Sequence, residues 1–364
     1  MKPNQIMVAY GERIPEMVTA LLERIKPEQQ LKPGAKIGLK PNLVLDKPAA
    51  SGATTHPEIV AAIISYFQAR GYQNLWIMEG SWVGAQTRRA FQTCGYTEVA
   101  QKYKVPLVDL KTDRTVVKQS SAMTLKVCAQ PLDVDYLINL PVLKAHCQTK
   151  LTCALKNLKG CIPDSEKRRF HTLGLHKPIA HLAAVLPVHL TIVDAICGDL
   201  TFEEGGNPVP MGRIIAGVDP VLIDTYAAAL IGLEAAEVPY ITIAGQLGVG
   251  TTDLAAAAIF ELNPEAKSSV IPRLSSRVQS LARYIEARQA CSACYGSLIH
   301  ALQRLDEEGS LAELQGSKIK IGQGFRSVAG AGPGVGSCTR KLDHSLPGCP
   351  PPALEIKKFL QELL

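Results

Sequence analysis

The sequence predicts an α/β fold, with a mostly parallel sheet covered by helices on both faces and a small C-terminal module. The first observation is that apolar, β-rich segments alternate with segments of helical period as far as about residue 265, as expected for strands joined by covering helices. The second is a change of composition after that point, where cysteines appear beside glycines. We therefore expect two domains, residues 1–265 and residues 266–364.

The first part of the chain contains four expected strands that alternate with helices. Pro57 suits the first turn of a helix, and Gly71 ends that helix because glycine readily adopts the conformation that follows a helix C-terminus. The expected strands are 5–10, 35–39, 74–78 and 105–110, and the expected helices are 14–25, 57–70 and 87–94. Residues 115–127 are expected to add one or two strands at a sheet edge.

The next part opens with a strand at 134–140, which Pro141 ends because proline cannot donate to a sheet ladder. Leucines at positions 151, 155 and 158 have the spacing of one helix face, so a short helix is expected there, with lysines on or beside its other face. Further expected elements are strands at 190–193 and 214–218, helices at 221–230, 238–247 and 275–290, and a short helix or strand at 254–259. A Gly/Pro-rich loop at 198–212 carries an acidic patch, Glu203 and Glu204.

Polar residues recur where the expected strands end. They are Lys40, Asn42, Glu79, Asn139, Lys144, Asp194 and Asp219. Ligands of open α/β sheets bind outside the carboxyl ends of the strands, so we expect these side chains to gather at one edge. The alternative is that each is an ordinary turn or surface residue, because Asn and Asp favour turns and Lys is soluble.

The positive charge of the chain is concentrated in one stretch. Residues 141–190 contain eight Lys or Arg against two Asp or Glu, which equals the net charge of +6 of the whole chain. This stretch includes Lys144, His146, Lys156 and Asn157, and a strand that leads into a basic loop and helix is typical of an anion site. A solvated basic helix is the alternative. Nucleic acid is not an expected partner, because neither aromatic stacking residues nor a groove-reading motif accompanies the charge.

The composition is that of a globular protein, with 46% hydrophobic and 20% charged residues. No stretch approaches ~18 unbroken apolar residues, so no membrane span is expected. The first residues lack the apolar region of a secretory signal. We therefore expect a cytoplasmic protein, in which ten cysteines serve as buried thiols or metal ligands rather than as disulfides.

Four cysteines near the C-terminus have the pattern of an iron–sulfur site. They are Cys291, Cys294, Cys338 and Cys349. A C-x-x-C turn presents two sulfurs to one centre, glycines flank the other two cysteines, and the last precedes proline, as in ferredoxin motifs. We expect these thiols to bind one [4Fe–4S] cluster. Structural zinc with four thiolates is the main alternative, and unliganded thiols are the other.

The other six cysteines fit no standard metal spacing, and we expect them to be small buried apolar residues. They are Cys94, Cys128, Cys147, Cys153, Cys161 and Cys197.

Several motifs between about residues 5 and 250 resemble the domain of unknown function 362 family. The motifs are KPNLV (40–44), TTHP (54–57), LPVLKAH (140–146), LT with ALKNLKG (151–160), Asp194-Ala195, and Asp219-Pro220 with Asp224. Members of that family are often joined to iron–sulfur modules, and the resemblance therefore implies the same kind of module here. The commonest version carries two compact four-cysteine runs, whereas this chain has one dispersed set, which implies a single cluster.

The function that we expect is that of an iron–sulfur redox protein, an oxidoreductase or an electron-transfer protein, that couples one cluster to an anionic small molecule at the strand ends. Lys40, Lys144 and Lys156 would neutralise the anion. His146 and His171 would donate protons, because imidazole titrates near neutrality. Asn42 and Asn157 would orient the ligand. Glu79 and Asp194 would bind a divalent cation or pair with the lysines.

A redox partner protein is a further expectation. The alternative function is a non-redox enzyme or ligand-binding module in which the metal, zinc or a cluster, is structural. The chain lacks a G-x-G-x-x-G motif after a strand, which argues against a nicotinamide or flavin site of that type.

Overall fold

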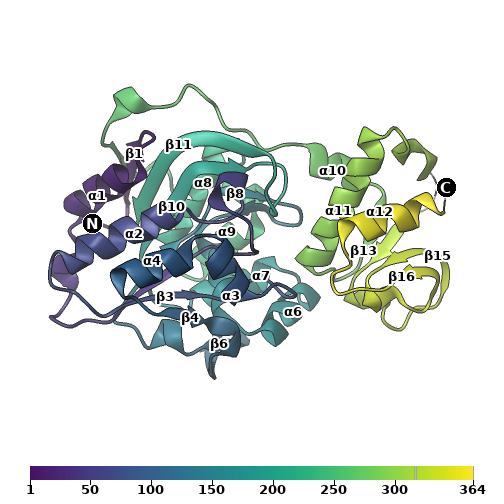
Figure 1. Ribbon diagram of the computed structural model, residues 1–364, viewed down its shortest axis with the longest axis horizontal. Coiled ribbons are helices and arrows are strands. Elements are labelled where there is room, and N and C mark those ends of the chain that lie inside the picture. The colour runs from purple at the N-terminus through teal and green to yellow at the C-terminus, as the bar shows by residue number, and fades with distance from the viewer. Residues whose placement is uncertain (315, 317, 364) are drawn as a thin grey trace. The chain divides into compact units, whose positions relative to one another are not determined.

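The computed structural model describes residues 1–314, 316 and 318–363, and the chain forms two compact units (Figure 1). The large unit contains Met1–Lys167 and His176–Leu274, and the small unit contains Arg168–Leu175 and Ser275–Leu364. Among the described residues, no helix is both long enough and apolar enough to cross a membrane.

The large unit is built on an eight-stranded sheet with the strand order β12-β1-β11-β10-β7-β2-β3-β4. The strands are β1 (Gln5–Tyr10), β2 (Ile37–Pro41), β3 (Leu75–Glu79), β4 (Leu107–Asp109), β7 (Tyr136–Leu140), β10 (Val188–Asp199), β11 (Pro208–Gly217) and β12 (Ala258–Glu261). All neighbouring pairs are parallel except the two pairs that involve β11. The expected mostly parallel α/β sheet is therefore confirmed.

The direction of β11 corrects one expectation about the strand ends. Because β11 runs antiparallel to both β1 and β10, its carboxyl end lies at the opposite edge of the sheet from theirs. Asp219 follows β11, so it does not join Lys40, Glu79 and Asp194 at the carboxyl edge of the parallel strands. Its side chain instead caps α8 (Pro220–Leu230) by accepting hydrogen bonds from Val221 and Leu222.

Helices cover both faces of the large sheet, because successive strand residues point to opposite faces. Met7 and Ala9 join a core with α1 (Ile14–Ile25), α2 (Pro57–Gln68) and α4 (Tyr96–Tyr103), which lie side by side in Figure 1. On the other face, the backbone of Gly217 approaches α8 so closely that an added Cβ would lie 2.7 Å from Ile223 Cδ1. The other helices of this unit are α3 (Thr87–Thr93), α5 (Ala154–Asn157), α7 (His176–Ala183) and α9 (Pro239–Gln246).

The basic stretch after β7 folds differently from the expected helix. It forms a small antiparallel hairpin, β8 (Lys144–His146) and β9 (Lys150–Thr152), followed by the short α5 and a 3₁₀ turn at Leu158–Cys161. The three leucines that predicted a helix face, at positions 151, 155 and 158, are buried. Lys156 is buried as well, although the leucine spacing predicts that it lies on the polar face. A second hairpin, β5 (Thr115–Ser120) with β6 (Met123–Cys128), forms a separate two-stranded sheet.

The small unit contains a parallel four-stranded sheet in the order β13-β14-β15-β16. Its strands are β13 (Ile285–Ala287), β14 (Ile319–Ile321), β15 (Gly330–Val335) and β16 (Leu342–Leu346), and its helices are α10 (Arg277–Ala282), α11 (Ser292–Glu307) and α12 (Ala353–Gln361). The prediction of one long helix at 275–290 is wrong, because only the short α10 forms there and the strand β13 follows it. The helix α6 (Asp164–Thr172) begins in the large unit, and its residues from Arg168 onward belong to the small unit.

Candidate functional site

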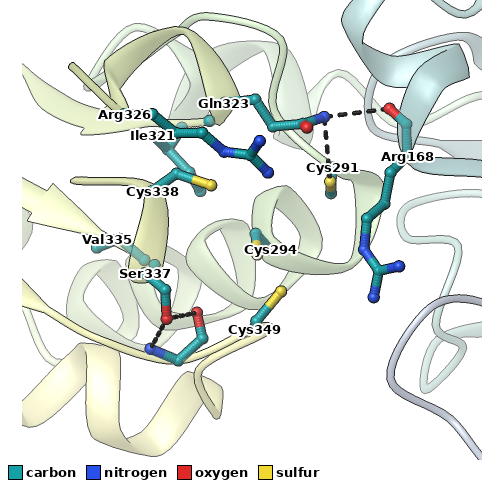
Figure 2. Close-up of a pocket in the computed structure, with 13 residues that line it drawn as sticks. Arg168, Cys291, Cys294, Ile321, Gln323, Arg326, Val335, Ser337, Cys338 and Cys349 are labelled. Atoms are coloured by element: carbon teal, nitrogen blue, oxygen red, sulfur yellow. Dashed lines mark hydrogen bonds between the residues drawn. The ribbon is translucent and has the colours of Figure 1, made fainter. Parts of the chain in front are cut away.

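The four C-terminal cysteines line one cavity of the small unit (Figure 2). Cys291 and Cys294 come from the start of α11, Cys338 from a 3₁₀ turn after β15, and Cys349 from the segment after β16. Parallel strands bring these segments together, because β15 and β16 end at the same edge of their sheet. The folding therefore gathers four thiols that lie up to 58 positions apart in the chain.

Positive charge surrounds these thiols. Cys291 is the N-cap of α11 and Cys294 lies in its first turn, where the helix dipole favours a negative group. The side chains of Arg168 and Arg326 line the same cavity, and Gln323 Nε2 lies 3.8 Å from Cys291 Sγ (Figure 2). These groups place positive charge beside sulfurs that would carry negative charge when they bind metal.

The thiols are close enough to affect one another. Burial raises the pKa of Cys294 to about 12, and the negative charges of Cys291, Cys349 and Cys338 add to this effect. Among the residues that the structure describes, no three His, Cys, Asp or Glu side chains converge closely enough to hold a single metal ion.

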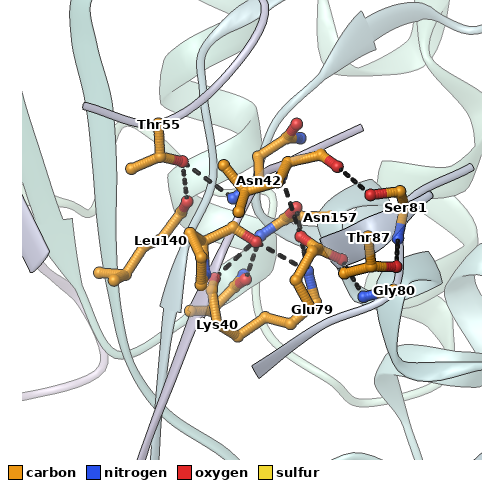
Figure 3. A network of polar contacts seen from close by, with 12 residues as sticks. Lys40, Asn42, Thr55, Glu79, Gly80, Ser81, Thr87, Leu140 and Asn157 are labelled. Carbon is orange, nitrogen blue, oxygen red and sulfur yellow. Dashed lines mark hydrogen bonds and ion pairs between the residues drawn. The ribbon is translucent and has the colours of Figure 1, made fainter. Parts of the chain in front are cut away.

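A first buried charge network lies at the carboxyl ends of β2 and β3 (Figure 3). Lys40 and Glu79 are both buried, and Lys40 Nζ lies 2.7 Å from Glu79 Oε2. Lys40 also donates to the carbonyl of Pro41 at 2.9 Å and lies 3.4 Å from Asn157 Oδ1. The second oxygen of Glu79 accepts the backbone N–H of Gly80 at 2.6 Å, so the carboxylate is neutralised and hydrogen-bonded within the chain.

Gly160 is a requirement of this network. A Cβ added there would lie 2.1 Å from Glu79 Oε1 and 2.5 Å from Lys40 Nζ. Asn157 lies in the same place, and its amide donates to the Asn139 side chain at 2.8 Å. The structure therefore brings Lys40, Glu79 and Asn157 together. Lys40 contacts both of the other side chains, so their polar groups are already paired within the chain.

A second network gathers Lys144, His146 and Lys156 around Glu203. Lys156 Nζ lies 2.5 Å from Glu203 Oε1, and His146 Nε2 lies 2.9 Å from Glu203 Oε2. Lys144, which is fully buried, donates to the backbone carbonyl of Glu203 at 3.1 Å and to that of Ala53 at 2.6 Å. The expected counter-charge for these lysines is thus supplied by Glu203, which the sequence marks only as part of an acidic patch.

The turn between β10 and β11 holds Glu203 in place. Asp199, at the end of β10, accepts the backbone N–H groups of Thr201 and Phe202 with one oxygen and that of Asn207 with the other. Gly206 N–H donates to the carbonyl of Ser51 at 2.9 Å. One signal in the sequence could have identified Glu203. It lies four residues after Asp199, the last residue of β10, and therefore in the turn at the carboxyl edge of the sheet.

Burial changes the pKa of Lys144, whose ammonium group lies near Asn42. Burial lowers the pKa of Lys144 to about 8, Glu203 opposes that shift, and Lys156 adds to it. Asn42 Oδ1 lies 3.5 Å from Lys144 Nζ, so Asn42 joins this network rather than that of Lys40. Lys144 therefore loses its proton more readily than a lysine in water does.

His146 is held in one tautomer. Its Nδ1 accepts the backbone N–H groups of Gln148 and Thr149, each at 3.0 Å, so the ring proton of the neutral form lies on Nε2, toward Glu203. Burial lowers the pKa of His146 to about 4, and Glu203 opposes the shift. His146 is therefore neutral at neutral pH and offers one N–H in that direction.

Asp224 on α8 fixes the short helix that carries Lys156. Its carboxylate accepts the backbone N–H of Ala154 at 2.6 Å and that of Leu155 at 3.1 Å, which satisfies two donors at the start of α5. A four-residue helix is not stable by itself, so this buried carboxylate defines the position of Lys156.

The remaining two expected site residues lie in other surroundings. Asp194 Oδ2 accepts from His56 Nδ1 and from the His56 backbone N–H, each at 2.8 Å. It therefore has partners different from those of Glu79, and the described residues contain no converged cation site formed by these two carboxylates. His171 lies on α6, in the segment that belongs to the small unit.

Comparison with known proteins gives one family and one curated relative. The sequence profile described as Domain of unknown function (DUF362) matches residues 37–229, a narrower span than we had expected. The Thylakoid-associated protein sll1697 of Synechocystis sp. is 29% identical over 244 residues, which cover 64% of this chain and 74% of that protein.

Two solved structures are similar to part of the chain. The lactate racemase apoprotein of Thermoanaerobacterium thermosaccharolyticum is 12% identical with a TM-score of 0.39, and the match covers 58% of this chain and 54% of that one. A Thermotoga maritima protein solved by structural genomics is 13% identical with a TM-score of 0.39, and the match covers 64% of this chain and 59% of that one. The chain thus spans less than two thirds of the length of either structure.

The first prediction concerns Lys156. Lys156→Ala leaves the buried carboxylate of Glu203 without its closest cation, and we expect a loss of roughly 3–5 kcal/mol in the free energy of unfolding. Both tryptophans, Trp76 and Trp82, lie in the large unit, so denaturant unfolding followed by tryptophan fluorescence measures that unit. Lys150→Ala is the matched control, because its partner Glu237 is exposed, and we expect little change.

The same variant shows whether Lys156 is a structural cation or a ligand-binding one. We expect thermal melts of Lys156→Ala to show the loss of stability both with and without phosphate-bearing metabolites. Unchanged stability without a ligand, together with lost stabilisation by phosphate metabolites, would contradict the role of Glu203 as the resident counter-charge.

The second prediction concerns pH. His146 has a pKa of about 4 in the folded chain and about 6.5 when unfolded, so the unfolded state binds the proton first as the pH falls. Stability from this group is therefore fully present above pH ~6.5 and is lost between pH ~6.5 and 4, by up to about 3 kcal/mol. We expect His146→Gln to flatten this part of the stability–pH curve of the large unit. The control is His344→Gln, because His344 is exposed. A stability–pH curve of His146→Gln that runs parallel to the wild-type curve would contradict the lowered pKa of His146.

Proposed function

Because the chain belongs to the family described as Domain of unknown function (DUF362), whose description assigns no activity, we propose its function from the two sites themselves. The proposal is an iron–sulfur redox protein in which Cys291, Cys294, Cys338 and Cys349 hold one [4Fe–4S] cluster. The observation that carries it is the gathering of these four thiols, from three segments of chain, around one cavity.

The chemistry of the donor set fits this group. A cluster bound here would accept and release single electrons. Arg168 and Arg326 would offset the negative charge of four thiolates, and the dipole of α11 would stabilise Cys291 and Cys294 in the same way. Gly336 has a φ of +94°, a conformation that favours glycine, and an added Cβ there would make only an ordinary contact of 3.8 Å with Cys294 Sγ.

Structural zinc is the rival for the same thiols. Zinc requires four ligand atoms about 2.3 Å from one ion, which draws the sulfurs close together. The same four thiols line the cavity in either case, so the metal content of the purified protein decides between the two. In the cluster each thiolate binds a separate iron, so the sulfurs remain further apart.

The second part of the proposal is a site for an anionic small molecule at the carboxyl edge of the large sheet. Lys144 and Lys156 would hold the anion, His146 would donate its Nε2 proton, and Asn42 would orient the ligand. What supports this is that two buried lysines meet at one residue: Lys156 pairs with the Glu203 carboxylate, and Lys144 donates to the Glu203 backbone carbonyl. A ligand anion would have to take the place of the Glu203 carboxylate, so binding would require the 200–207 turn to move.

The third prediction tests the cluster ligands. We expect Cys338→Ala to lose most of the iron and the broad absorbance near ~400 nm that dithionite bleaches, because a cluster with three thiolates is held less tightly. The proteins are to be purified anaerobically, and iron and the visible spectrum are to be measured per chain.

Cys128→Ala is the control for this experiment, since Cys128 is buried in the large unit and its thiol donates to the Leu110 carbonyl. It should retain the wild-type iron content. Full iron content in Cys338→Ala would contradict the ligand set, and a colourless wild-type protein that contains zinc would favour the structural alternative.

A further inference from the structure

The carboxylate of Glu203 occupies the place that a ligand would take in the anion site. Its Oε1 lies 2.5 Å from Lys156 Nζ, and its Oε2 lies 2.9 Å from His146 Nε2. All three residues are buried. The site therefore presents one nitrogen to each of the two oxygens of a planar carboxylate.

Glu203 satisfies Lys156 but not His146. Because His146 Nδ1 accepts two backbone N–H groups, the ring proton lies on Nε2. Although Nε2 is 2.9 Å from Glu203 Oε2, its N–H lies too far off the line between the two atoms to form a hydrogen bond, and this buried nitrogen has no other acceptor in the described part of the chain. A buried donor without an acceptor is costly. The site thus holds a donor that the chain itself leaves open.

The attachment of Glu203 to its turn explains this incomplete fit. The backbone carbonyl of Glu203 accepts from Lys144 at 3.1 Å, and Gly206 N–H donates to the Ser51 carbonyl at 2.9 Å. A Cβ added to Gly205 would lie 2.6 Å from the Ser51 carbonyl oxygen, so the turn lies directly against that segment. A carboxylate on a fixed backbone has few orientations, whereas a free carboxylate can turn to face both donors.

We propose that Glu203 is a built-in substitute for the ligand, and that the anion site takes a small monocarboxylate in place of the Glu203 carboxylate. This inference rests on the anion site of the proposed function, and it adds the class of ligand and the movement that admits it. The 200–207 turn must shift to release Glu203, so the carboxylate of the chain competes with the ligand. A tethered competitor acts at a high effective concentration, which closes the resting chain to weak ligands.

The charge that remains after this release matches one negative charge. Among the buried charges of this network outside the 200–207 turn, Lys144 and Lys156 are positive, and Asp199, at the end of β10, is negative. The charge of Asp199 acts on Lys144. His146 adds no charge, because protonation of Nδ1 would break its two hydrogen bonds. A monocarboxylate balances the one net positive charge, whereas a phosphate dianion would add a second negative charge near Asp199.

The turn can shift without breaking the large sheet. Residues 200–207 join β10 to β11 and belong to neither strand. Gly205 and Gly206 have φ values of +74° and +129°, which glycine adopts without strain. Backbone rotation at this pair moves Glu203 while the two strands keep their pairing.

The fourth prediction uses acetate as the probe and Glu203→Ala as the variant. Truncation removes the built-in carboxylate and leaves both donors. We therefore expect acetate to raise the melting temperature of the large unit, followed by tryptophan fluorescence, by about 3–6 °C at ten times its Kd. The wild-type chain should not respond, because Glu203 fills the site. Phosphate at the same ionic strength should have no effect beyond that of chloride in either protein.

Two further variants locate the effect. Adding Lys156→Gln to Glu203→Ala should abolish the response to acetate, because the cation that faces the carboxylate is lost. Glu237→Ala is the matched control, since it removes a glutamate whose lysine partner, Lys150, is exposed. Acetate should not change the melting temperature of this control.

Hydrogen exchange in the wild-type chain tests the movement without any variant. Acetate at molar concentration should speed exchange of the backbone N–H groups of residues 200–207, compared with chloride at the same concentration, because acetate competes with Glu203. The hairpin of β5 and β6 should show no change that depends on acetate. This measurement decides the proposal if Glu203→Ala does not fold.

Three results would overturn the proposal. Stabilisation of Glu203→Ala by phosphate as strong as that by acetate would exclude the carboxylate class and leave the anion site of the proposed function standing. No response of this variant to either anion would overturn the anion site as well. If the variant does not fold, equal exchange of residues 200–207 in acetate and in chloride would exclude the exchange of Glu203 for a ligand.

Discussion

Buried positive charge at the carboxyl edge of the large sheet is the constraint on which the rest of that unit depends. A lysine removed from water is costly unless a counter-charge accompanies it. Glu79 accompanies Lys40, and Glu203 accompanies Lys144 and Lys156. These carboxylates arrive from distant segments, so the ends of the parallel strands and the 200–207 turn must come together before any one lysine can be buried.

The same constraint explains how much could be predicted from the sequence. Alternating strands and helices, with polar residues at the strand ends, were sufficient to predict the parallel sheet and the gathering of Lys40, Glu79 and Asn157. Local pattern could not show that β11 runs antiparallel and carries Asp219 to the other edge, because strand direction is decided by long-range pairing. It could not show the role of Glu203 either, since a loop glutamate has no periodicity that marks it as buried.

The cysteines show the difference between what local spacing predicts and what only the fold determines. Spacing and flanking glycines grouped Cys291, Cys294, Cys338 and Cys349 in the sequence, and these four residues line one cavity. Composition alone treated the other six as equivalent. The fold separates them: Cys94, Cys128, Cys153 and Cys161 are buried as expected, whereas Cys147 and Cys197 are partly exposed, which corrects the expectation for these two.

The measurement that tests the central claim most directly is the metal and sulfide content of the full chain purified without oxygen. One [4Fe–4S] cluster requires about four iron atoms and about four acid-labile sulfides per chain, with no zinc. About one zinc per chain without sulfide would contradict the redox proposal and leave the four thiols as a structural metal site.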